Sequence, residues 1–187
     1  MSFCCVGFTM EKFKKLEKYL TLFKIIFVGH TVFFLSIGFL RGNTVLLSTL
    51  EKHFSASLTR IQLCFNSAML LGFAIGGFIS GLVIGKFGVR KPSIVCSLTT
   101  FTGWALVAFL IKYGGGENSN IYLYLIGLTM VLFISLPSGI QCSCVAGSIK
   151  ENIPEFGGLA VTMMCAGVSS GGLILPKILS DLNNDYA

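Results

Sequence analysis

Residues 72–91 read GFAIGGFISGLVIGKFGVRK, an apolar, glycine-rich run that ends in a short basic turn. Two sets of small residues recur there at every fourth position: Gly72, Gly76, Ser80 and Gly77, Gly81, Gly85. On an α-helix each set forms a ridge along which a neighbouring backbone can pack closely. Glycine costs about 1 kcal/mol per residue in a soluble helix, whereas close packing and a self-bonded backbone offset that cost in a bilayer. The run therefore predicts a membrane-spanning helix whose ridges face other helices.

Composition extends this prediction to all 187 residues. Hydrophobic residues make up 53% of the chain and charged residues 12%, whereas soluble domains carry about 25% charged residues. The mean hydropathy is +0.81. An all-α, multi-pass transmembrane bundle is therefore predicted, with the lipid bilayer as its first partner.

Several functional classes are not expected. The sequence lacks a Ser/His/Asp set, paired carboxylates, a phosphate loop and a metal-ligand cluster, so we predict no enzyme activity, cofactor or metal. The seven cysteines lie in apolar runs or before the basic tail, which favours reduced thiols over a disulfide framework. The net charge of +6 is typical of membrane topology, and no nucleic-acid partner is expected.

Five spans joined by short loops are predicted: residues 20–42, 61–85, 93–111, 121–149 and 157–179. Each is close to or above the ~20 residues that cross a bilayer. A loop is predicted over residues 51–60, and the Pro137-Ser138-Gly139 sequence predicts a kink in the fourth span. A short tail, residues 180–187, follows the last span.

The basic tail of residues 1–19 has two interpretations. Its lysines and apolar residues fit an amphipathic helix on anionic lipid, or a solvated tail that orients the first span. With this tail inside, inner segments hold eight Lys and Arg residues, and outer segments hold four. This asymmetry predicts a cytoplasmic N-terminus, and we expect the chain in the plasma membrane.

The basic turn carries a resemblance to a known superfamily. Its pattern, Gly81-x-x-x-Gly85-Lys86-x-Gly88-x-Arg90-Lys91, resembles the signature loop between the second and third spans of the major facilitator superfamily. In that superfamily an acidic residue stands where this chain has Gly85, and it helps to lock one conformation. The resemblance implies a weakened lock here, or a turn that serves topology alone.

Two flanking regions are similar to the monocarboxylate transporter family. They are Thr44-Val45-Leu46-Leu47 with the Leu50–Ser57 segment, and the small residues Leu159-Ala160, Ala166-Gly167, Gly171 and Pro176. Two family features are missing: an acidic-glycine-aromatic motif in the first helix and a basic pair where Phe156-Gly157 stands. The resemblance covers most of residues 38–179 and implies movement of a small carboxylated solute, with or without a proton, by alternating access.

The resemblance also has an implication for the number of helices. Family members have twelve helices in two halves, and five are predicted here. The resemblance therefore implies a fragment or truncated form, or a chain that pairs with a second transporter half or an accessory membrane protein. The rival hypothesis is a non-transporting scaffold, a degenerate transporter half that binds a partner.

Arg41 and His30 are the predicted substrate-binding residues. The resemblance places Arg41 where many family members carry a lysine that contacts the substrate carboxylate, and a guanidinium can donate two parallel hydrogen bonds to a carboxylate. The alternative is an arginine that extends to outer headgroups. His30 lies eleven residues earlier, within ~20° of the same helical face and ~16 Å along the axis. It either lines a cavity with Arg41 or hydrogen-bonds a neighbouring helix, while Lys24 is expected to reach lipid phosphates.

Overall fold

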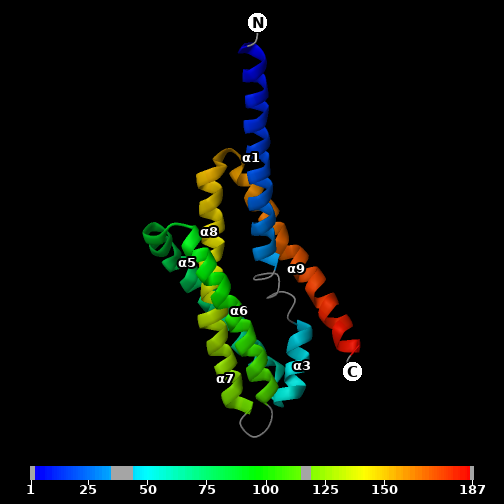
Figure 1. Ribbon diagram of the computed structural model, residues 1–187. Helices are drawn as coiled ribbons and strands as arrows, with labels where there is room; N and C mark the ends of the chain where they lie inside the picture. Colours follow the sequence, from blue (N-terminus) through cyan, green and yellow to red (C-terminus); the bar gives the residue numbers. More distant parts are fainter. Residues whose placement is uncertain (1–2, 35–43, 115–118, 186–187) are drawn as a thin grey trace.

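The computed structural model describes residues 3–34, 44–114 and 119–185. Within these ranges the chain consists of helices joined by short turns and contains no strand, which confirms the predicted all-α class (Figure 1). The helices are α1 (Phe3–Phe33), α3 (Thr44–Phe54), α4 (Leu58–Gln62), α5 (Ala68–Phe87), α6 (Arg90–Tyr113), α7 (Ser119–Thr129), α8 (Leu136–Asn152) and α9 (Gly157–Asp185).

Two π-helical segments join shorter helices into long ones. Leu63–Ser67 connects α4 to α5, and Met130–Ser135 connects α7 to α8. The second lies just before Pro137, whose ring lacks an N–H and cannot continue an ordinary α-helical ladder. The irregularity predicted at Pro137-Ser138-Gly139 is therefore taken up as a π-helical turn on its N-terminal side.

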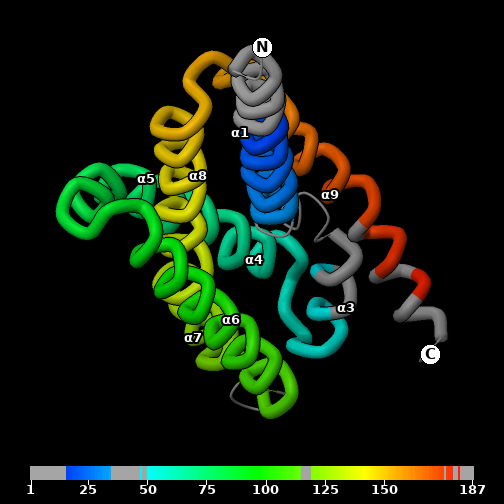
Figure 2. The backbone as a smooth tube through the Cα atoms, turned by 45° about the horizontal axis from the view of Figure 1, so that its top comes forward, coloured from blue at the N-terminus to red at the C-terminus, as the bar shows by residue number. Residues whose placement is uncertain are grey.

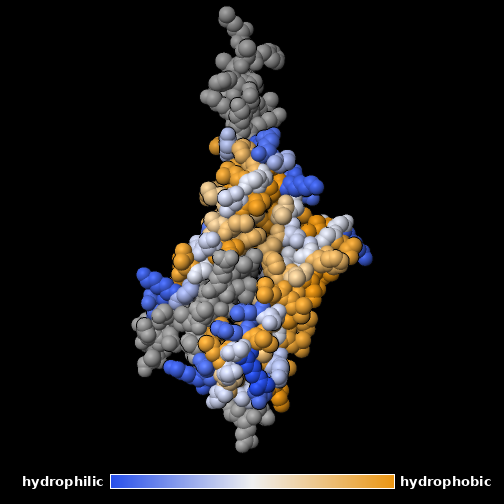
Figure 3. Space-filling view, turned by 180° about the vertical axis from the view of Figure 1, so that it is seen from behind, coloured by the Kyte–Doolittle hydropathy of each residue, from blue (hydrophilic) through white to orange (hydrophobic). Residues whose placement is uncertain are grey.

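Four of the described helices are long and apolar enough to cross a membrane: Leu58–Phe87, Arg90–Tyr113, Ser119–Asn152 and Pro154–Ile178. They correspond to the last four predicted spans. Only 17% of the apolar window of Arg90–Tyr113 is buried inside the structure, so most of this helix is free to contact lipid. Hydrophobic side chains cover much of the upper middle and the right side of the face shown in Figure 3. The first predicted span, 20–42, overlaps α1 and ends outside the described residues, so it stays a prediction.

Helix α8 lies at the centre of the bundle. It packs along α5 and α6 and also contacts α1, while α1 runs alongside α9 (Figures 1 and 2). One buried cluster joins α4, α5 and α7 through Ile61, Met69 and Ile126. A second cluster joins α1, α8 and α9 through Leu22, Ile149, Ile153, Ala160 and Met164.

The first glycine ridge packs as predicted. Gly72, Gly76 and Ser80 are buried on α5, and a Cβ added to Gly72 would lie 2.6 Å from the Cβ of Ser135. On the facing helix α8, a Cβ added to Gly139 would lie 2.8 Å from the backbone nitrogen of Gly77. Small residues on both helices therefore let the two backbones approach closely.

The second ridge does not pack, and the prediction that it faces another helix was wrong for the described chain. Gly77, Gly81 and Gly85 are exposed, and a Cβ on any of them would have no atom within 4 Å. The two ridges lie on different sides of α5, because residues 76 and 77 are ~100° apart on a helix. Only the Gly72–Gly76 side meets α8.

The predicted loop over residues 51–60 was too long. Helix α3 continues to Phe54, and α4 begins at Leu58. Leu47, Leu50 and Phe54 are all buried, and their spacing of three and four residues places them on one helical face. That apolar face extends α3 into the charged sequence around Lys52.

Candidate functional site

Of the two predicted substrate-binding residues, the structure describes His30 but not Arg41. Arg41 lies outside the described residues. His30 lies on α1, which as described ends at Phe33. Placing both residues on one face requires an unbroken helix over residues 20–42, so a shared cavity stays a prediction.

His30 connects α1 to α9 through both ring nitrogens. Its Nδ1 lies 3.0 Å from the carbonyl oxygen of Met163, and because a carbonyl can only accept, Nδ1–H is the donor. Its Nε2 lies 3.4 Å from the hydroxyl oxygen of Ser170, whose one hydrogen is donated to the Gly167 carbonyl at 3.1 Å. These contacts fit the second predicted alternative, a histidine that hydrogen-bonds a neighbouring helix.

The backbones of α1 and α9 are also close at this point. A Cβ on Gly167 would lie 3.2 Å from the backbone carbonyl carbon of His30. A Cβ on Gly29 would meet Val145 of α8 at 3.0 Å and would overlap the side chain of Met164. Glycines at both positions therefore allow α1 to fit between α8 and α9, and they fix where the imidazole of His30 can reach.

The residues of the signature loop lie around the tight turn between α5 and α6. Gly88 has a φ of +70°, a conformation that side chains disfavour and glycine adopts freely, and its N–H bonds the Ile84 carbonyl at 2.8 Å. The three basic residues of the loop, Lys86, Arg90 and Lys91, are exposed. Gly81 and Gly85 precede the turn on the open side of α5. Because α5 ends at Phe87 and α6 begins at Arg90, the turn is shorter than the segment left between the predicted spans 61–85 and 93–111.

One buried polar contact was missed from the sequence. Gln141 on α8 is only 8% exposed, and its Nε2 donates to the hydroxyl of Ser97 on α6 at 2.6 Å. A glutamine in an apolar span is the signal that could have revealed it, since an intramembrane amide needs a hydrogen-bond partner. This contact ties α6 to the centre of the bundle.

Two cations contact neighbouring segments at opposite ends of the bundle. Lys18 on α1 pairs with Glu155 before α9 and lies 5.7 Å from the ring centroid of Phe156. At the opposite end, the Arg60 guanidinium donates to the hydroxyl of Tyr124 at 2.9 Å. Among the described residues, no group of three or more His, Cys, Asp and Glu side chains could hold a metal ion.

Fold and site together define a helical, multi-pass membrane protein, with four described helices long and apolar enough to cross a membrane. The chain is similar to two proteins of Trypanosoma brucei brucei, glucose transporter 1B/1C/1D/1F/2B and glucose transporter 1E, each at 32% identity over 88 residues. The match covers 47% of this chain and 15% of the length of each relative. No family model matches the chain, and no solved structure matches it.

Both relatives are sugar transporters, which belong to the major facilitator superfamily. The similarity therefore supports the superfamily that the signature loop indicated. Neither relative is a monocarboxylate transporter, so that narrower family stays a prediction.

Proposed function

We propose that this chain forms part of a membrane transporter that moves a small polar organic solute by alternating access. The observation that carries the proposal is the combination of a transmembrane helical bundle with similarity to glucose transporters. In such transporters two halves rock around a central site near the bilayer midplane. A second half, from the same or another chain, is therefore part of the proposal.

The first candidate substrate is a small carboxylate, with or without a proton. It rests on Arg41, a cation near the end of the first predicted span whose fork of donors matches a carboxylate. His30 is the second proposed substrate-binding residue. Its ring already contacts α9, so substrate binding would require the Ser170 contact to open.

The second candidate substrate is a hexose, which the printed names of the relatives favour. Sugar hydroxyls are recognised by neutral donors and acceptors, and a binding site for them needs no cation. The two candidates therefore make different demands on Arg41. A carboxylate needs its charge, and a hexose does not.

Uptake measurements test the proposal and separate the substrates. The gene would be deleted and restored in its own cells, and uptake of radiolabelled lactate, pyruvate and glucose would be compared at equal growth. We expect uptake of one of the two classes to fall on deletion and to return on restoration. Unchanged uptake of all three solutes would contradict the proposal as stated.

The rival function is a membrane scaffold that binds a partner without transport. It predicts no change in uptake together with a stable membrane complex. Crosslinking in intact membranes, followed by mass spectrometry of the epitope-tagged chain, would identify such a complex. A partner without transporter homology, combined with unchanged uptake, would favour the scaffold.

A further inference from the structure

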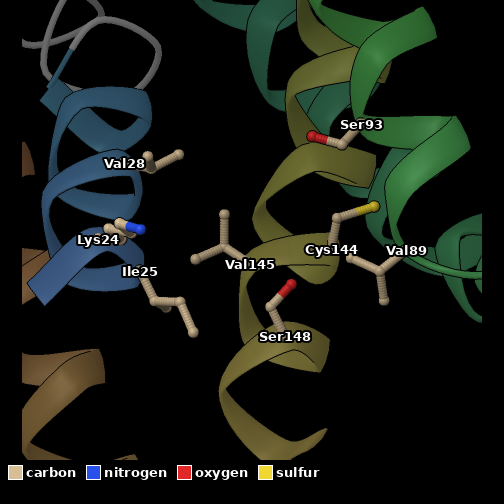
Figure 4. A pocket seen from close by; sticks show the side chains of 8 residues that line it. All are labelled: Lys24, Ile25, Val28, Val89, Ser93, Cys144, Val145 and Ser148. Atoms are coloured by element: carbon tan, nitrogen blue, oxygen red, sulfur yellow. The ribbon is translucent and has the colours of Figure 1, made fainter. Parts of the chain in front are cut away.

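An open groove lies among α1, α8 and the start of α6. It has a volume of about 210 Å³ and is walled mainly by apolar side chains, among them Ile25 and Val28 of α1 and Val145 of α8. Figure 4 shows Lys24 pointing from α1 toward α8 across this groove. The hydroxyls of Ser93 and Ser148 line the groove from α6 and α8.

The groove opens toward the basic end of the bundle, the end that carries the exposed residues Lys86, Arg90, Lys91 and Lys150. A second cavity of about 560 Å³ shares Ser93 and Ser148 with the first and adds Arg90, Glu151 and Asn152. The two cavities therefore adjoin at these two serines and are treated together as one depression. Its inner part is apolar, and its outer part is polar.

The described lining of this depression carries one more positive than negative charge. Lys24 forms no ion pair with any described residue, since the ion pair found among them is that of Lys18 with Glu155. Glu151 is the one carboxylate on the described lining, and Arg90 lies on the same lining. Lys91 and Lys150 are exposed next to them. A cation at the edge of an apolar membrane groove is stabilised by a counter-anion.

We propose that this depression binds one anionic phospholipid. Its phosphate would accept a charge-assisted hydrogen bond from the ammonium of Lys24, with the hydroxyls of Ser93 and Ser148 as further donors on the lining. Its acyl chains would follow the apolar wall formed by Ile25, Val28 and Val145. The basic end is predicted to lie on the cytoplasmic side. The cytoplasmic leaflet is the one rich in anionic lipid.

Neither a neutral lipid nor an apolar protein helix fits the groove as well. A zwitterionic headgroup offers Lys24 no net charge. An apolar helix laid over the groove would bury an unpaired ammonium, which is costly. The proposal does not depend on which solute the protein transports.

Native mass spectrometry of the purified full chain tests the proposal. The protein in detergent is titrated with equal amounts of phosphatidylglycerol and phosphatidylcholine, and the ratio of the two bound lipids is measured. We expect wild type to retain phosphatidylglycerol preferentially and Lys24→Gln to lower the ratio about tenfold, the effect of one charge-assisted hydrogen bond. Lys24→Arg should keep most of the preference, and Lys112→Gln, at the opposite end, should keep all of it.

Two further measurements on wild type keep the test independent of how the variants fold. A photoactivatable phosphatidylglycerol should crosslink to peptides that contain Ile25 or Val145, and crosslinks confined to other surfaces would overturn the proposal. Inorganic phosphate or glycerol phosphate should not displace the lipid. Displacement at equal concentration would identify a soluble-anion site instead, and equal lipid ratios in Lys24→Gln and Lys112→Gln would exclude Lys24 as the anchor.

Discussion

Gly76 on α5 lies directly against Leu136 on α8: a Cβ on Gly76 would lie 2.9 Å from the Leu136 carbonyl carbon. The atom in the way belongs to backbone, which cannot move aside as a side-chain end can. The next residue, Gly77, has no atom within 4 Å of an added Cβ. Two adjacent glycines on one helix therefore have opposite roles.

Gly76→Ala should consequently destabilise the protein, whereas Gly77→Ala should not. Overpacking at Gly76 should lower the free energy of unfolding by about 1–3 kcal/mol. Gly77→Ala should be neutral, or stabilising by up to about 1 kcal/mol from helix propensity. Thermal unfolding of the two variants in the same detergent measures this difference, and equal losses at both positions would show that the α5–α8 contact is misplaced.

His30→Ala should loosen the contact between α1 and α9. The change removes the hydrogen bond to the Met163 carbonyl, worth about 0.5–1.5 kcal/mol, and the contact of Nε2 with Ser170. Thr31→Ala is the matched control, because the Thr31 hydroxyl donates only to Phe27 within its own helix. A His30 variant as stable as the Thr31 variant would mean that the histidine does not brace the two helices.

The ion pair between Lys18 and Glu155 should contribute little to stability. Both side chains are substantially exposed, at 42% and 69%, and exposed pairs are typically worth below about 1 kcal/mol. A double-mutant cycle with Lys18→Gln and Glu155→Gln, repeated at high salt, measures the coupling. We expect a small coupling that falls as salt rises, and a salt-independent coupling above roughly 2 kcal/mol would refute an exposed pair.

Membrane orientation can be tested at two exposed positions at opposite ends of one long helix. Asn120 lies near the start of Ser119–Asn152 and Lys150 near its end. In a cysteine-free background, Asn120→Cys should react with an impermeant maleimide in intact cells, and Lys150→Cys should react only after permeabilisation. The reverse pattern would place the N-terminus outside.

The sequence predicted those features that a single helix determines. The periodicity around Gly72 and Gly76 predicted a membrane helix and a close contact, and the apolar runs predicted the helices that cross the bilayer. Which of two equivalent ridges meets a partner depends on the tertiary arrangement, so the Gly77 ridge was wrongly assigned. The sequence of the helix itself does not distinguish the Gly76 ridge from the Gly77 ridge.

The features that were missed arise where distant segments meet. Phe54 continues α3 because Leu47, Leu50 and Phe54 are buried together. The groove at Lys24 is assembled from three helices that are far apart in the sequence. A lysine near the start of a span could be predicted to reach lipid phosphate, but the apolar walls and serine hydroxyls that surround it could not.

Transport itself is tested most directly by solute counterflow in proteoliposomes. The protein would be purified from its own membranes with any second half attached, and vesicles would be preloaded with unlabelled lactate or glucose. We predict transient accumulation of the labelled form of one of these solutes. If that solute is the carboxylate, Arg41→Gln should lower its apparent affinity about ten- to a hundredfold, while Lys112→Gln should leave it unchanged. No counterflow of either solute by folded, correctly inserted protein would contradict the proposed function.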